Sequence, residues 1–171
     1  MQLLEGGHMK MNALDAIKTR RNIKNFKPNE IDQHLILSWL EAAAMAPNHR
    51  MTEPWEIYFI GTETREKLNH KTNFGNAPIV LMIVSKHGAS SVETEENAHA
   101  TACFIQNFNL AAWAEGVGTF WSSIGITPKN RGILGVPDGY DIIGVLGVGY
   151  PEVIPEPKPR TPIKNKIRNL P

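Results

Sequence analysis

Cysteine is almost absent from the 171-residue sequence: Cys103 is its single thiol, so no disulfide can form within the chain. Cys103 lies in an apolar stretch, which favours a packed thiol over a reactive one, and the lack of further cysteines fits a reducing cytoplasm. An excess of charge is also missing, since 18 Lys plus Arg stand against 17 Asp plus Glu. No overall field therefore draws the protein to nucleic acid or to a membrane surface, and any anion site has to be local.

Long apolar runs and several catalytic signatures are missing as well. No segment approaches the ~20 apolar residues of a membrane span, and the start of the chain lacks the apolar core of a signal peptide. No GxGxxG, GxxxxGK[ST] or GxSxG motif occurs, which argues against a Rossmann dinucleotide site, a P-loop and a nucleophilic serine. The histidines show no paired spacing that would place two on one helical face, so no metal site is expected: His8, His34, His49, His70, His87 and His99.

The composition predicts a globular protein with one domain. Hydrophobic residues make up 42% of the chain and charged residues 20%, and the length is enough to bury a sizeable core. Residues 1–10 contain a Gly-Gly-His-Met sequence typical of a remnant of an expression tag, so we expect a tag or a disordered leader there. No internal repeat or interdomain linker follows, and residues 11–171 are expected to form a single domain.

Apolar periodicity predicts both helices and strands. Residues 32–46 carry apolar side chains at helical spacing, and the pattern stops at Pro47. Residues 77–85 are apolar on both faces, which indicates a central strand, and the proline-rich tail after residue 150 is expected to run extended over a surface. The same reasoning predicts short helices at residues 12–21, 62–70 and 127–135 and further strands at residues 55–60 and 140–150.

The segment 93–115 has helical composition and ends at Gly116. Its large apolar residues point in several directions around the helix axis, so we expect a helix that is buried nearly all round: Phe104, Ile105, Phe108, Leu110 and Trp113. A chain of this length has little surface with which to cover such a helix. The pattern therefore predicts a second subunit, in a homodimer.

A basic cluster lies where the first predicted helix gives way to extended chain. The sequence TRRNIK places Arg20, Arg21 and Lys24 around Asn22. Guanidinium groups bind phosphate through paired hydrogen bonds, and an amide adds a further donor. A solvated basic patch is the alternative interpretation.

Two further polar stretches adjoin predicted core elements. The sequence APNHR places His49 in a loop between a helix and a strand, where an imidazole can act as an acid, a metal ligand or a donor to a heterocycle. The sequence GVGTFWSSIG has a glycine-rich start followed by Trp121, Ser122 and Ser123. Such a segment suits the polar edge of a flat ring, and it also suits an ordinary strand entry.

In their order along the chain, these segments resemble the compact branch of the FMN-dependent nitroreductase family. The resemblance runs from residue 12 to residue 163 and is carried by TRRNIKNFKP, LEAAAMAPNHRMTEPWEIYFI, NAPIVLMIV, ATACFIQNFNLAAWAEGVGTFWSS and GVLGVGYPEVIPEPKPR. The family implies an α+β fold, in which a small mixed β-sheet is flanked by helices in an intertwined homodimer with two FMN sites at its interface.

The resemblance also implies an activity, that of an NAD(P)H-dependent flavin oxidoreductase. In its ping-pong reaction, NADH or NADPH as co-substrate gives hydride to flavin N5 and leaves, and an oxidising small molecule such as a nitroaromatic or quinone takes the electrons. The cofactor carries this chemistry, so no catalytic side chain is expected.

By position, Arg20, Arg21 and Asn22 correspond to the family's phosphate and ribityl contacts, and Lys24 to a lysine near the pyrimidine edge of the flavin. The other implied FMN-binding residues are His49 in the loop that reaches the flavin, Trp121, Ser122 and Ser123 along the ring or ribityl chain, and Arg160 at the phosphate.

The chain also departs from the family pattern. Asn22 replaces the family's serine, and Met51 and Glu53 stand where many members have Asn and Gln, so we expect different contacts at the ring edge. A flavin-binding sensor or storage protein with little turnover would use the same phosphate site. The sequence leaves that alternative open, together with a flavin-free interaction module on the same scaffold.

Overall fold

The computed structural model describes residues 11–171, which contain one four-stranded sheet. The strands are β1 (Trp55–Phe59), β2 (Ile79–Lys86), β3 (Gly118–Ser122) and β4 (Tyr140–Gly149), in the order β1-β2-β4-β3. Neighbouring strands are antiparallel, with Ile57 opposite Ile83 and Met82 opposite Val145. The predicted leader, residues 1–10, lies outside the described residues.

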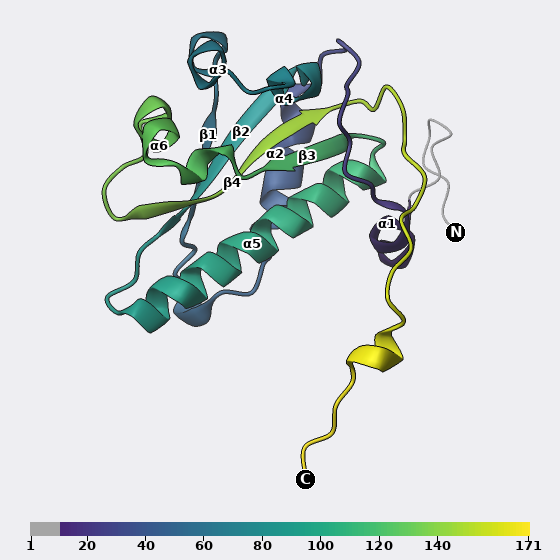
Figure 1. The fold of residues 1–171 in the computed structure, drawn as a ribbon, viewed down its shortest axis with the longest axis vertical. Coiled ribbons are helices and arrows are strands. Elements are labelled where there is room, and N and C mark those ends of the chain that lie inside the picture. The colour runs from purple at the N-terminus through teal and green to yellow at the C-terminus, as the bar shows by residue number, and fades with distance from the viewer. Residues whose placement is uncertain (1–10) are drawn as a thin grey trace.

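Helices cover both faces of this sheet (Figure 1). They are α1 (Ala13–Thr19), α2 (Gln33–Ala43), α3 (Thr62–Leu68), α4 (Asn73–Asn76), α5 (Ser91–Ala114) and α6 (Pro128–Leu134), with 3-10 turns η1 (His49–Met51), η2 (Ile124–Ile126) and η3 (Ile163–Lys166). On one face Trp39 of α2 and Phe104 of α5 belong to the same buried cluster as Leu81 of β2. On the other face, Phe74 of α4 packs in a second cluster with Val80. None of the described helices is long and apolar enough to cross a membrane.

The α+β class is confirmed, but the four strands form an antiparallel sheet and not a mixed one. β2 and β3 run in the same direction, as the crossover through α5 allows, yet β4 lies between them and runs against both. Among residues 11–171, parallel pairing is limited to a single bridge between Asn22 and Thr119.

The local signals for α6 are confirmed in detail. The Thr127 side chain accepts the backbone N–H of Asn130, and Pro128 occupies the first position of the helix. Gly135 ends the helix in the left-handed conformation, with φ of 62°.

The prediction that the helix at residues 93–115 is buried nearly all round is wrong for the single chain. Only one side of α5 is buried: Asn97, Ala100, Thr101, Phe104, Ile105, Phe108, Asn109, Ala112 and Trp113. The opposite side is exposed and carries Glu95, Glu96, His99, Cys103 and Gln106. Of the five large side chains, Phe104, Ile105, Phe108 and Trp113 belong to the buried side and Leu110 is half-buried, while Cys103 lies on the exposed side and is not packed.

The proline-rich tail leaves the body of the molecule. Residues 152–171 are exposed throughout, including Val153, Ile163 and Leu170, and Figure 1 shows them running past α1 and away from the sheet. The tail is extended except at η3, as its prolines predict, but in the single chain it covers little of the surface.

Candidate functional site

Three guanidinium groups gather at the end of α1. Arg20 is the C-terminal cap of the helix and is half-buried, and its Nη1 donates to the carbonyl oxygen of Arg21 at 3.3 Å. Burial and the nearby charges of Arg160 and Arg21 lower the pKa of Arg20. The structure therefore brings the tail residue Arg160 close to Arg20, and the role of these residues toward a phosphate stays a prediction of the family resemblance.

The Arg21 side chain stabilises the end of α1, and one of its buried N–H groups has no hydrogen-bond partner in the described residues. Its Nη1 donates to the carbonyl oxygens of Lys18 at 3.0 Å, Thr19 at 2.7 Å and Arg20 at 3.0 Å, which have no partners within the helix. Its Nε is buried and has no hydrogen-bond partner in the described part of the chain. A buried guanidinium donor left unpaired is costly, and an anion at this place would satisfy it.

Carboxylates do not neutralise this cluster. Within residues 11–171, the ion pairs involve Arg50, Lys67, His87 and Arg131, and none involves Arg20, Arg21 or Arg160. Burial is the larger cause of the lowered pKa of Arg20, and the like charges of Arg160 and Arg21, which have no counter-charge, lower it further. This arrangement suits a bound dianion such as phosphate.

The segment after α1 runs along the edge strand β3. Asn22 forms a bridge with Thr119, and its Oδ1 accepts the backbone N–H of Trp121 at 3.4 Å. The N–H of Ile23 donates to the Thr119 carbonyl at 2.9 Å. These contacts place Asn22 beside the Trp121 segment, so two of the predicted clusters lie next to each other.

A cavity of about 360 Å³ opens beside this segment. Its lining residues come from the extended segment after α1 and from the tail: Asn22, Lys24, Asn25, Val153, Pro155 and Lys158. Lys24 and Asn22 were predicted, whereas Lys158 and Asn25 were not. The spacing of the KPR sequence was a usable signal for Lys158, because residues two apart in an extended chain point to the same side.

The aromatic ring of Trp121 is held in place at the sheet. Its Nε1 donates to the carbonyl oxygen of Ile143 at 3.1 Å, and the side chain remains 39% exposed. Gly144 leaves room for the ring, since a Cβ there would lie 2.3 Å from the Trp121 Nε1.

Ser122 is buried, and its hydroxyl accepts the Ile124 N–H at 3.2 Å, while Ser123 is exposed. Of the two serines, only Ser123 presents its side chain to solvent.

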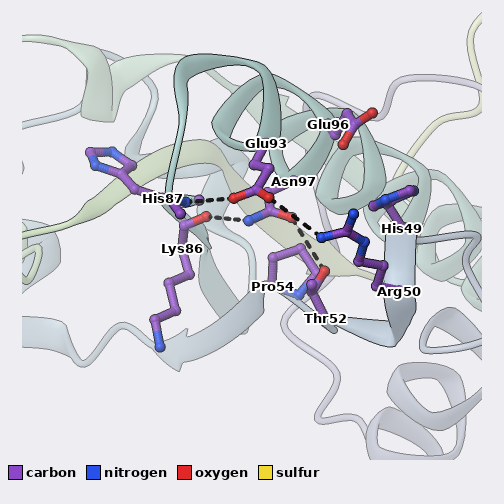
Figure 2. A pocket seen from close by; sticks show the side chains of 11 residues that line it. His49, Arg50, Thr52, Pro54, Lys86, His87, Glu93, Glu96 and Asn97 are labelled. Carbon is purple, nitrogen blue, oxygen red and sulfur yellow. Dashed lines mark hydrogen bonds and ion pairs between the residues drawn. The ribbon is translucent and has the colours of Figure 1, made fainter.

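His49 lies in a second cavity, of about 320 Å³, at the N-terminal end of α5 (Figure 2). Arg50, Lys86, Glu93 and Asn97 line the same cavity. Figure 2 shows Arg50 between His49 and Glu93, and the Arg50 Nη1 lies 3.8 Å from the Glu93 Oε1. Cations and carboxylates are balanced here, unlike at the arginine cluster.

The structure does not bring His49 to the arginine cluster within one chain. Asn97 on α5 lies beside the loop of residues 47–54, called here the His49 loop. At the other end of α5, near Arg20, the Nε1 of Trp113 donates to the Thr19 hydroxyl at 3.0 Å. Trp113 lies sixteen positions after Asn97, a separation of about 24 Å at the helical rise of 1.5 Å per residue. The predicted site residues thus form two groups at opposite ends of α5.

Comparisons with known proteins agree in sequence and in fold. The Nitroreductase family model matches residues 17–73 and 65–150. YfhC of Bacillus subtilis (strain 168), provisionally named an NAD(P)H nitroreductase, is 32% identical over 180 residues, which span 91% of this chain and 93% of the relative. The nitroreductase-like family protein from Bacillus cereus has a TM-score of 0.84 at 28% identity and covers 95% of this chain and 97% of its own.

A more distant structure shares the fold. The NADPH:FMN oxidoreductase from Vibrio harveyi, solved in complex with NAD+, has a TM-score of 0.84 at 19% identity over 92% of this chain and 76% of its own. The match to the family model covers most of the sheet and helices described above. The chain is therefore an oxidoreductase that belongs to the nitroreductase family.

Proposed function

We propose that the chain is an FMN-dependent NAD(P)H oxidoreductase acting on nitroaromatics, quinones or similar oxidants. The observation that carries the proposal is the cluster of Arg20, Arg21 and Arg160, which has no carboxylate partner in the described residues. The names of YfhC and of the Vibrio harveyi structure support the pyridine nucleotide and the flavin. When bound, FMN would supply a ring that takes hydride from NADH or NADPH at N5 and passes the electrons to the oxidant in a second half-reaction.

The arginine cluster suits the phosphate end of FMN. A phosphate monoester carries nearly two negative charges, and hydrogen bonds from guanidinium to phosphate are about twice as strong as neutral ones. The unpaired Nε of Arg21 and the crowded charge of Arg20 would both be stabilised by such a ligand. We therefore expect tight binding of FMN and weak binding of riboflavin.

Lys24 and Lys158 suit the flavin end. Both line the cavity of about 360 Å³, within the usual size of ligand pockets. Their ammonium groups would hold positive charge beside the ring, where negative charge grows during reduction. The Oδ1 of Asn22 is occupied by the Trp121 N–H, which leaves its amide nitrogen as the group to donate to the cofactor.

The separation of His49 from the arginine cluster supports a homodimer. A cofactor bound near Arg20 lies about 24 Å along α5 from the same chain's His49 loop, but the loop of a second copy would be able to reach it. Apolar side chains beside the cluster lack cover, with Leu14 64% and Ile17 57% exposed on α1 and Ile163 75% exposed in the tail. A second copy would bury them and complete each site with residues from both chains.

The test is spectroscopic. Protein reconstituted with FMN and kept free of oxygen should lose its yellow colour with NADH or NADPH and regain it when a quinone is added. Protein that binds FMN without bleaching would favour a sensor or storage role, and protein that takes up no FMN would refute the proposal.

A further inference from the structure

The His49 loop has a strained backbone. Arg50, Met51 and Glu53 have φ of 54°, 55° and 44°, a left-handed region that residues other than glycine rarely adopt. Each such residue costs free energy, and the conformation persists only where surrounding contacts impose it. The contacts that hold this loop therefore decide where His49 points.

Asn97 of α5 joins the loop to the body of the protein. Its side chain is 8% exposed, and its Nδ2 donates to the carbonyl oxygen of Lys86 at the end of β2 at 3.0 Å. Its Oδ1 accepts the Thr52 hydroxyl at 3.2 Å, as Figure 2 shows. The N–H of Lys86 in turn donates to the Pro54 carbonyl at 2.8 Å. One buried amide thus links the loop, a central strand and α5.

Apart from the Lys86–Pro54 backbone hydrogen bond at its end, the other hydrogen bonds and ion pairs of the loop are internal or exposed. Asn48 accepts the Glu53 N–H at 3.0 Å and donates to the Ala46 carbonyl at 3.2 Å, which shapes the loop without attaching it to the sheet. The Arg50–Glu93 pair is 3.8 Å long with Arg50 75% exposed, so solvent screens it. Asn97 supplies the buried side-chain attachment.

We propose that Asn97 is a positioning residue of the flavin site. Through the Thr52 hydroxyl, it fixes the strained loop in the conformation that presents His49 to the cofactor of a second copy, so the inference rests on the proposed function. Both polar ends of the Asn97 amide are already engaged, and it therefore acts through the loop without touching the ligand. Sequence patterns give no signal for this role, because Asn97 resembles any polar residue of an amphipathic helix.

The test compares four variants of the FMN-loaded protein. Asn97→Ala removes both hydrogen bonds, and Thr52→Val removes the link to the loop from an exposed position where folding is not at risk. Thr52→Ser keeps the hydroxyl. Thr101→Val is the matched control, because Thr101 is a buried α5 residue whose hydroxyl bonds only to the Asn97 carbonyl within the helix.

Trypsin cleavage after Arg50, identified by mass spectrometry, reports opening of the loop, and the FMN dissociation constant and visible circular dichroism report the site. We expect Asn97→Ala and Thr52→Val to raise the cleavage rate and the dissociation constant by about tenfold, as the loss of an ordinary hydrogen bond allows. Their flavin dichroism should also change. Thr52→Ser and Thr101→Val should match the wild type in all three measurements.

Other results would overturn the inference. If Thr52→Val and Asn97→Ala match Thr101→Val, the amide does not hold the loop. If cleavage rises while FMN affinity and dichroism stay unchanged, the loop is held but does not serve the flavin site. A wild-type protein that fails to bind FMN would instead refute the proposed function itself, and so the two failures are distinguishable.

Discussion

Replacing Arg20 by alanine should remove much of the protein's preference for FMN over riboflavin. Arg20 is half-buried at a helix end, and this burial, followed by the nearby charges of Arg160 and Arg21, lowers its pKa. Charge-assisted hydrogen bonds contribute about 1.5–3 kcal/mol each, so the loss of Arg20 should weaken FMN binding by roughly 10- to 150-fold. Riboflavin lacks the phosphate, and its affinity should change little.

The assay is a titration of apoprotein with each flavin, followed by the quenching of flavin fluorescence. Arg160→Ala should lose less than Arg20→Ala, because the exposed tail can adjust while α1 fixes Arg20. Lys18→Ala is the matched control, since it removes an exposed charge from the last turn of α1 and should preserve the preference. The melting temperature of Arg20→Ala apoprotein should hold or rise, because the two causes that lower the Arg20 pKa, burial of its charge and repulsion from Arg160 and Arg21, are both removed. If Arg20→Ala discriminates between FMN and riboflavin as the wild type does, Arg20 is not a phosphate ligand.

Four further outcomes are expected. Arg21→Ala should lower the melting temperature, measured by circular dichroism, because three carbonyls at the end of α1 lose their donor; an unchanged melting temperature would contradict that role. His49→Ala should weaken FMN binding or change substrate preference and leave measurable turnover, whereas full FMN content with no activity would identify a general acid. Gly144→Ala should destabilise the fold by roughly 1–3 kcal/mol in urea titrations, because a Cβ would meet the Trp121 ring at 2.3 Å, while Gly132→Ala, with nothing within 4 Å, should not. Sedimentation at low micromolar concentration should show only dimer, and a stable monomer that retains FMN would refute the shared site.

Local signals were enough to predict several elements of the fold. A capping residue followed by proline predicted the start of α6, which the structure has at Pro128–Leu134. The helical spacing of apolar residues predicted that α2 ends before Pro47, as it does. The order of strands was not predictable, because nothing in the strand at 140–150 says that it lies between β2 and β3. The burial of α5 was misjudged for the single chain, because the prediction followed the large apolar residues and gave no weight to the polar residues that form the exposed side, such as Glu95, Glu96 and Gln106.

In the candidate site, too, local signals were predictable and contacts between distant segments were not. Arg20 and Arg160 could be paired only through the family resemblance, and the structure places them together. Lys158 had a local signal in its spacing from Arg160, but Asn97 had none, because its role depends on a loop more than forty residues earlier in the sequence. The roles of these residues toward FMN, the single-domain boundary and the cytoplasmic location stay predictions.

Stopped-flow absorbance under anaerobic conditions tests the proposed activity most directly. The FMN-loaded protein is mixed with NADH or NADPH, and the bleaching of the flavin band is recorded before a quinone is added. The proposed function predicts bleaching whose rate rises with nucleotide concentration and is at least as fast as steady-state turnover, followed by return of the band with quinone. A flavin band that stays unchanged with both nucleotides, in protein that holds its FMN, would contradict it.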